Sequence, residues 1–340
     1  MIKYIHIIII SIILCNININ NNKSDLNTKN NKNKIITKYK TANNSIHKKN
    51  VLLSLVVKYS WEIIFPFIKS FVNSKIPNCD FILFVQNISK SVVNKLKSFG
   101  IIVYHIPNNF KNTKIFSLRW KIYSEFLKNN VDKYNLVLSV DIRDTIIQKD
   151  LFSLYESFEQ FLAFSFEDGY IYKLINNDWI INKFGMRLFE TIKYERIINA
   201  GTVWGTIKIF IEFANILWDK LSIFPEAIDQ TVINYLIYHE KILHKYLKFS
   251  DLDGPVMTVG LTKKGNLSLD SENNIINYNG KVASIVHQYD RHKYIKINIK
   301  NKLCPELIDK KNIKIIFILS EILSVILLTY LIKEKHKKRN

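Results

Sequence analysis

Two aspartates flank an arginine in the segment VDIRD, at the end of a hydrophobic run (residues 140–144). Asp141 and Asp144 would repel each other at close range unless a cation lies between them. A Mg²⁺ or Mn²⁺ ion that bridges both carboxylates to a diphosphate provides such a cation, because hard cations bind carboxylate and phosphate oxygens together. Arg143 provides another, as an ion pair with one aspartate while the other caps a turn. The spacing by itself supports a metal site and a structural ion pair about equally.

The elements that would position these aspartates alternate between strand and helix. Continuous apolar runs of strand length stand at residues 51–57, 80–86, 101–106 and 134–140. Segments with helical spacing of apolar residues separate them, at residues 61–72, 89–99 and 118–129. This alternation predicts a mostly parallel, Rossmann-like α/β sheet with helices on both faces. Ligands of such sheets bind beyond the carboxyl ends of the strands, so the VDIRD segment is expected at a ligand site.

Composition and charge narrow the class of protein. The 340-residue chain is 48% hydrophobic and 13% aromatic, which is typical of a globular protein. Its net charge of +20 is concentrated at the ends, with +7 in residues 20–50 and +4 in residues 333–340. The remaining +9 forms no arginine or lysine stripe, so we interpret it as a solvated basic surface and expect no nucleic-acid partner. Neither a GxGxxG nor a GxxxxGK[ST] motif occurs, which disfavours dinucleotide-binding and P-loop proteins.

Both ends of the chain suggest a membrane. Residues 1–19 contain a short apolar run that suits a signal peptide, with an uncleaved signal anchor as the alternative. Residues 20–50 are polar and rich in Lys and Asn, as in a stalk. Residues 313–332 are apolar enough to predict a transmembrane helix despite Glu321, and a terminal amphipathic helix packed on the domain is the alternative.

The charge distribution then predicts the orientation. The basic residues 333–340 would stay cytosolic by the positive-inside rule, and their last four, KKRN, resemble a dilysine signal for return to the endoplasmic reticulum. We therefore expect an endoplasmic reticulum or Golgi membrane protein with a luminal domain. Four N-glycosylation sequons are compatible with this location, at Asn22, Asn43, Asn87 and Asn266. Cys79 and Cys304 would be able to pair there, although one pair is no disulfide framework.

Four segments resemble those of one family. LSVDIRDTIIQKDLF (residues 138–152) is similar to the D-x-R-D segment of eukaryotic nucleotide-diphospho-sugar transferases, with Leu151 where proline is usual. INAGTVWGT (198–206), DQTVINYLIY (229–238) and IVHQYDR (285–291) follow in the order that this family shows. The resemblance implies a glycosyltransferase-A fold with a single catalytic domain, residues 51–300. In that fold a D-x-D motif at the same strand end holds a divalent metal and the sugar nucleotide.

The resemblance also implies roles for individual residues. Asp141, Asp144 and His287 would bind the metal, Mn²⁺ or Mg²⁺. Asn199 and Gly201 would shape the sugar pocket, with Asn199 bonding sugar hydroxyls through both ends of its amide. Asp229 would be catalytic, by positioning a hydroxyl or acting as general base, although it is also a plausible helix N-cap. Four more residues would bind substrate: Arg119, Arg143, Gln230 and Arg291.

The function expected from this resemblance is transfer of a sugar, hexosyl-like, from a nucleoside-diphosphate donor. The acceptor would be a glycan, a protein or a lipid. A metal-dependent nucleotidyltransferase is one alternative, but no glycine-rich, basic loop follows residues 51–57. A degenerate, non-catalytic relative that binds nucleotide sugar at a membrane is another.

Overall fold

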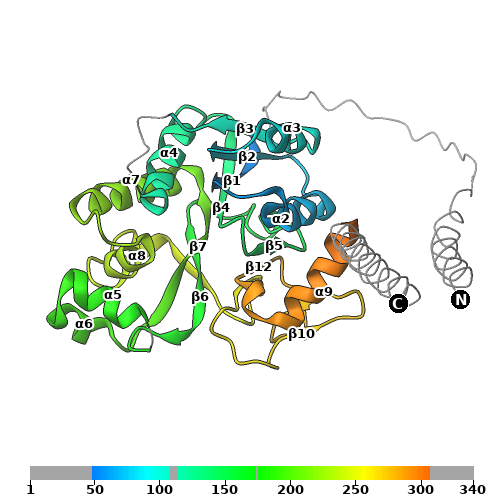
Figure 1. The fold of residues 1–340 in the computed structure, drawn as a ribbon. Coiled ribbons are helices and arrows are strands. Elements are labelled where there is room, and N and C mark those ends of the chain that lie inside the picture. The colour runs from blue at the N-terminus through cyan, green and yellow to red at the C-terminus, as the bar shows by residue number, and fades with distance from the viewer. Residues whose placement is uncertain (1–47, 108–113, 174, 307–340) are drawn as a thin grey trace, which may run out of the picture. The chain divides into compact units, whose positions relative to one another are not determined.

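A computed structural model of the chain describes residues 48–107, 114–173 and 175–306, which belong to one compact unit. A seven-stranded sheet with the strand order β3-β2-β1-β4-β7-β6-β8 forms its centre (Figure 1). The strands of this sheet are β1 (Lys49–Val57), β2 (Cys79–Gln86), β3 (Ile102–His105), β4 (Tyr134–Val140), β6 (Leu162–Tyr170), β7 (Arg196–Thr206) and β8 (Leu247–Ser250). A three-stranded sheet lies beside it and consists of β5 (Thr145–Ile147), β9 (Val256–Thr258) and β12 (Ile285–His287). A third pairing joins β10 (Ser268–Leu269) and β11 (Ile275–Ile276).

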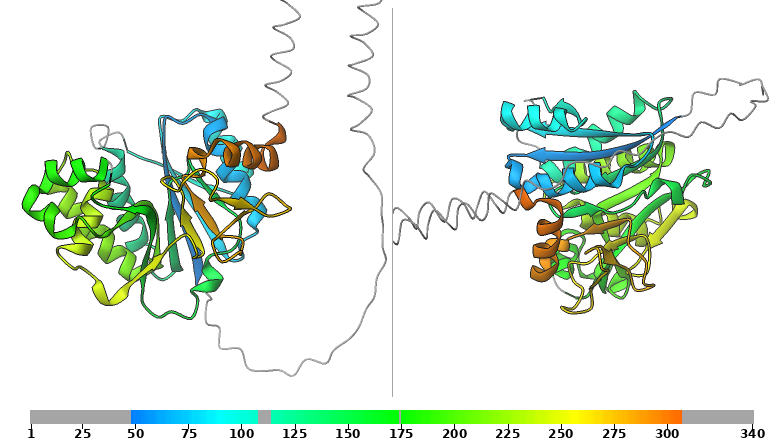
Figure 2. Two further views of the ribbon diagram at one scale, coloured as in Figure 1. Left: turned by 90° about the horizontal axis from the view of Figure 1, so that it is seen from below. Right: turned by 90° about the vertical axis from the view of Figure 1, so that its right-hand side faces the viewer.

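Helices cover both faces of the central sheet (Figure 2). The α-helices are α2 (Trp61–Ser74), α3 (Lys90–Ser98), α4 (Ile115–Lys128), α5 (Ile175–Phe184), α6 (Met186–Ile192), α7 (Ile207–Ile223), α8 (Asp229–Tyr238) and α9 (Lys293–Leu303). Short 3₁₀ turns are η2 (Phe152–Leu154), η3 (His244–Tyr246) and η4 (Tyr289–Arg291). Alternate residues of β1 explain the two layers, because Leu52 and Val56 pack in a core with α2 and α9, whereas Val51 and Leu53 pack in a core with α4, α7 and α8.

The predicted α/β class is confirmed. Strands β1 to β4 of the central sheet run parallel to one another, and the seven elements predicted up to residue 140 occur in the predicted order. The strands after β4 make the sheet mixed, because β7 runs antiparallel to both of its neighbours, β4 and β6. One boundary was wrong: β1 begins at Lys49, inside the segment expected as stalk, because Lys49 already pairs with Tyr134 of β4.

The membrane segments predicted from the sequence lie outside the described residues. These are residues 1–19, 313–332 and 333–340, together with nearly all of the stalk. Within the described part of the chain no helix has the length and apolar character to span a bilayer. The predicted location therefore stays a prediction. Asn87 and Asn266 are exposed, as glycosylated residues must be. Cys79 and Cys304 are both free thiols, so the possible pair does not form: Cys79 begins β2, while Cys304 is buried after α9.

Asp80 fastens the amino-terminal ends of three neighbouring strands. Its carboxylate accepts bonds from Lys49 (2.8 Å), Lys133 (2.8 Å) and Tyr134 (2.9 Å). Burial would raise the pKa of this carboxyl, but the three donors outweigh burial and lower it. Asp80 lies at the edge opposite to VDIRD, so its role is structural.

We expect the Asp80→Asn substitution to lower the free energy of unfolding by about 1–2 kcal/mol at pH 7, because the two lysines are half-exposed and the pairs are screened. A lowered carboxyl pKa stabilises the fold above the unfolded value of about 3.9, and this stabilisation is lost as the pH falls further. Urea unfolding at pH 7 and pH 3 measures both effects. A difference between wild type and variant that persists undiminished at pH 3 contradicts the ionic role.

Candidate active site

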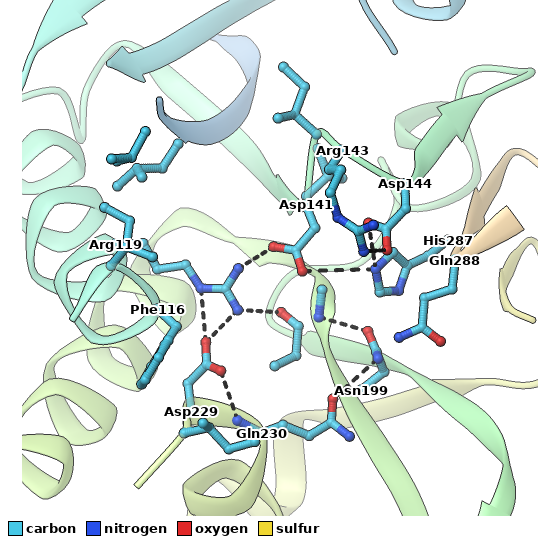
Figure 3. Close-up of a pocket in the computed structure, with 18 of the residues that line it drawn as sticks. Phe116, Arg119, Asp141, Arg143, Asp144, Asn199, Asp229, Gln230, His287 and Gln288 are labelled. Atoms are coloured by element: carbon cyan, nitrogen blue, oxygen red, sulfur yellow. Dashed lines mark hydrogen bonds and ion pairs between the residues drawn. The ribbon is translucent and has the colours of Figure 1, made fainter. Parts of the chain in front are cut away.

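A cleft of about 330 Å³ opens at the carboxyl ends of β1 and β4. Residues that follow or end these strands line it together with residues from α4, β7, α8 and β12 (Figure 3). The parallel pairing of β1 with β4 brings Val57 and Asp141 to the same edge of the sheet. The predicted ligand site at VDIRD therefore coincides with a cleft.

Asp141, Asp144 and His287 lie together in this cleft. His287 Nε2 is 3.5 Å from Asp144 Oδ1 and 3.9 Å from Asp141 Oδ2, and one ligand atom from each side chain lies within 4.8 Å of the others. Asp144 and His287 are buried, whereas the Asp141 side chain is 42% exposed and opens into the cleft. Two carboxylates and one imidazole, converging with one side open, fit a divalent cation.

Backbone pairing explains how residues so distant in the sequence converge. Strand β12 pairs with β5 so that His287 lies opposite Thr145, the residue after Asp144. Strand β7 pairs with β4 up to Val140, and the Asp141 N–H that follows donates to Gly201 O at 2.8 Å. A Cβ atom at Gly201 would overlap the His287 ring and come within 2.9 Å of Asp141 Oδ2. Glycine at position 201 is therefore required for His287 to reach the aspartates.

Gly205, from the same segment, has a different role. A Cβ atom at Gly205 would lie 2.5 Å from the Phe161 carbonyl oxygen, next to β6. Only Gly201 lines the cleft. Gly205 instead allows β7 and the chain entering β6 to pack closely.

Charge within the cluster is balanced by several cations. Arg143 binds Asp144 and also Asp290, the latter at 3.1 Å. Asp144 is therefore both a partner of Arg143 in an ion pair and a candidate metal ligand. Burial would lower the pKa of His287, but Asp144 and Asp141 outweigh burial and raise it. Burial would raise the pKa of Asp144, but His287 and Arg143 lower it. The two aspartates thus favour the protonated form of the imidazole, and His287 with Arg143 favours the ionised form of Asp144.

Arg119 and Asp229 form a buried pair at the opposite wall of the cleft. Asp229 Oδ2 accepts bonds from Arg119 Nε (2.9 Å), Arg119 Nη2 and Trp120 Nε1 (3.0 Å), and Oδ1 accepts from the Gln230 N–H at 2.9 Å. Arg119 also binds Asp141 and the Ala200 carbonyl oxygen. Burial would lower the pKa of Arg119, but Asp229 and Asp141 outweigh it and raise the pKa. Arg119 is therefore a fixed cation that holds Asp141 in place.

The position of Asp229 differs from the N-cap that the sequence suggested. Ile228 occupies the cap, and Asp229 is the first residue of α8. Asn234, the last polar residue of the DQTVIN segment, clamps α8 to β7: Nδ2 donates to Ile198 O at 2.9 Å, and Oδ1 accepts from Ile198 N at 3.0 Å. This clamp fixes the start of α8 against the cleft.

Asn199 and Gln230 converge on Glu167. Glu167 Oε1 accepts from Asn199 Nδ2 at 2.9 Å and from Gln230 Nε2 at 3.0 Å. Asn199 Oδ1 in turn accepts from the Gly201 N–H at 2.7 Å. Both ends of the Asn199 amide are thus engaged with protein groups, rather than left for sugar hydroxyls as we expected. Asn199 positions Gly201, and Gln230 contributes to this group from the second position of α8.

The remaining predicted residue, Arg291, lies at the outer edge. Its side chain is 52% exposed, and Nη2 is 4.0 Å from Asp144 Oδ2. Arg291 is not among the residues that line the cleft, but it remains within reach of an anion bound beside Asp144. Sequence reasoning missed two residues altogether: Glu167, which carries no motif, and Gln288, which lines the cleft next to His287.

Comparison with known proteins finds distant likenesses only. No protein-family model and no curated protein matches the sequence. Among solved structures, the bifunctional glycosyltransferase WbbM is 13% identical, with a TM-score of 0.48, over 77% of this chain and 51% of WbbM. The glycosyltransferase GlyE of Streptococcus pneumoniae TIGR4 is 17% identical, with a TM-score of 0.38, over 60% of this chain and 46% of GlyE.

The galactosyltransferase LgtC, in complex with donor and acceptor sugar analogues, is 14% identical with a TM-score of 0.41. That alignment covers 70% of this chain and 86% of LgtC, whereas the chain spans about half the length of WbbM and GlyE. Likenesses this distant assign no function.

Proposed function

We propose that this protein is a glycosyltransferase of the glycosyltransferase-A type, which uses a nucleoside-diphosphate sugar and a divalent metal. The observation that carries the proposal is the convergence of Asp141, Asp144 and His287 at the open end of a cleft beyond parallel strands. The cluster joins two of the four segments that resemble nucleotide-sugar transferases. The second and third segments along the chain, which contain Asn199 and Asp229, line the same cleft.

The three ligand residues would hold Mn²⁺ or Mg²⁺, and one imidazole beside two carboxylates favours Mn²⁺. A divalent cation bound there supplies positive charge to the departing nucleoside diphosphate. In the reaction, the bond between the sugar C1 and the diphosphate oxygen breaks, a bond from an acceptor hydroxyl oxygen to C1 forms, and the hydroxyl proton passes to an oxygen of the departing diphosphate. Arg143 and the more exposed Arg291 would stabilise the diphosphate as its charge develops.

Arg119 and Asp229 act on this reaction indirectly. Arg119 binds Asp141 and so holds one carboxylate oriented toward the cleft, and Asp229 holds Arg119. Because Asp229 Oδ2 already accepts three N–H groups, its geometry favours such a positioning role over that of a general base. The acceptor would enter through the open side and be a glycan, a protein or a lipid.

Metal removal tests the proposal with the full-length protein. We expect hydrolysis of at least one member of a panel of nucleotide sugars in Mn²⁺, its loss in EDTA, and its return when Mn²⁺ is added in excess. Release of nucleoside diphosphate is the readout. Binding of a donor without turnover would instead support the non-catalytic alternative, and no binding of any donor would exclude both.

A further inference from the structure

Gln288 adopts a backbone conformation that glutamine disfavours. It follows His287 directly, with φ 59° and ψ 28°, in the left-handed region. A side chain with a Cβ atom is strained there, and glycine or asparagine is the usual occupant. Strained residues of this kind gather at functional sites, where the surrounding structure holds them. The conformation therefore marks Gln288, which lines the cleft, as a candidate functional residue.

The fold leaves space for this side chain at Gly260. A Cβ atom at Gly260 would overlap Gln288 Oε1 and come within 2.8 Å of its Cδ. The backbone conformation at position 260 does not require glycine, since its φ is not positive. The absence of a side chain at position 260 therefore serves to let the Gln288 carboxamide lie in its observed place.

The Gln288 carboxamide has no hydrogen-bond partner among the described residues, although it is only partly exposed and lines the cleft. Figure 3 shows it on the same side of the cleft as His287, facing the residues around Asn199. Every other labelled amide there is engaged: Asn199 and Gln230 both bond to Glu167. An amide that is held in place without a partner is available to a ligand.

We propose that Gln288 is a specificity-determining residue whose carboxamide hydrogen-bonds a hydroxyl of the donor sugar. This inference rests on the proposed function and adds to it. A carboxamide donates and accepts, which matches a hydroxyl, whereas phosphate oxygens accept only. The cleft already offers Arg143 and the metal ligands to the diphosphate, so a neutral amide beside them suits the uncharged part of the donor.

Two substitutions remove the contact in different ways. Gln288→Gly deletes the side chain and relieves the left-handed strain, so the melting temperature should not fall. Gly260→Ala keeps the glutamine but displaces its carboxamide. Gly169→Ala is the matched control, because its Cβ would meet Ile197 and Leu261 side chains at an ordinary 3.5 Å, outside the cleft.

Titration calorimetry in Mn²⁺ compares a nucleotide sugar, the nucleoside diphosphate alone, and nucleotide sugars that lack one ring hydroxyl each. Both variants should bind the complete nucleotide sugar about 3- to 10-fold more weakly, with nucleoside diphosphate affinity unchanged. One of the deoxy nucleotide sugars should bind wild type more weakly than the complete nucleotide sugar does, by the same factor. The variants should bind that deoxy nucleotide sugar and the complete one equally well. The Gly169→Ala protein should match wild type throughout.

Other outcomes separate the two proposals. Equal weakening for the nucleoside diphosphate would make Gln288 a phosphate contact and overturn its role toward the sugar. If wild type binds a nucleotide sugar and the variants bind it equally well, the role of Gln288 is wrong while the proposed function stands. If wild type binds no nucleotide sugar, both fall.

Discussion

Replacing Asp144 with asparagine is expected to weaken Mn²⁺ binding by more than about 100-fold and to remove nearly all metal-dependent turnover, since even residues that only support metal ligands contribute about 10- to 100-fold. Asparagine keeps the shape of the side chain but loses the charge that faces His287, Arg143 and the candidate metal position. The loss is not compensated by Asp141, because Arg119 already binds one of its oxygens.

Electron paramagnetic resonance of free Mn²⁺ gives the affinity, and nucleoside diphosphate release gives the rate. Asp150→Asn is the matched control: Asp150 lies on the same segment, accepts from the Phe152 N–H at 2.9 Å through Oδ1, and lies outside the cleft. Asparagine preserves that acceptor, so the control should keep both properties. Mn²⁺ affinity and rate that survive in Asp144→Asn would show that the pair with Arg143 is the only role of Asp144.

Strands β1, β2 and β4 were predictable because each is a continuous, largely buried apolar run. Leu52 and Leu53 show why, since consecutive residues pack in different cores. The reversal of β7 was not predictable, because no local pattern records which neighbour a strand pairs with or in which direction. The pairing of β12 with β5 is equally non-local, and only the resemblance of the IVHQYDR segment placed His287 with the aspartates.

The motifs also did not distinguish residues that line the cleft from residues that only stabilise the fold. Gln148, part of the D-x-R-D resemblance, holds the backbone of Ile275 and Ala283 with three bonds of 2.8–2.9 Å. Asn234 of the DQTVIN segment clamps a helix to a strand. Glu167 was not predicted as a site residue because it lies within β6 and belongs to no motif. It nevertheless orients Asn199 and Gln230. Residue type and spacing cannot reveal which side of a strand a carboxylate faces when both sides are buried.

Asp229→Asn is expected to lower the free energy of unfolding by about 3–5 kcal/mol, the usual cost of removing one partner from a buried ion pair. The Arg119 guanidinium would remain buried with Asp141, which is partly exposed, as its only carboxylate. Urea unfolding at pH 7 measures the change. The matched control is Asp251→Asn, which breaks the two-bond pair with Arg196; both of those side chains are about one-third exposed, so the loss should stay within about 1 kcal/mol.

The same variant distinguishes a positioning residue from a general base. A positioning role predicts that Asp229→Asn loses stability and activity together, and that Arg119→Met combined with Asp229→Leu recovers part of the stability, because no buried charge is left without a partner. A general base predicts a kinetic signature that positioning does not: in Asp229→Asn the kcat falls about 10²- to 10⁴-fold and the acidic limb of the pH–rate profile disappears. Burial raises the pKa of Asp229, but the bonds at Oδ2 favour the first pattern, since an oxygen that already accepts three N–H groups is not free to accept a proton from an acceptor hydroxyl.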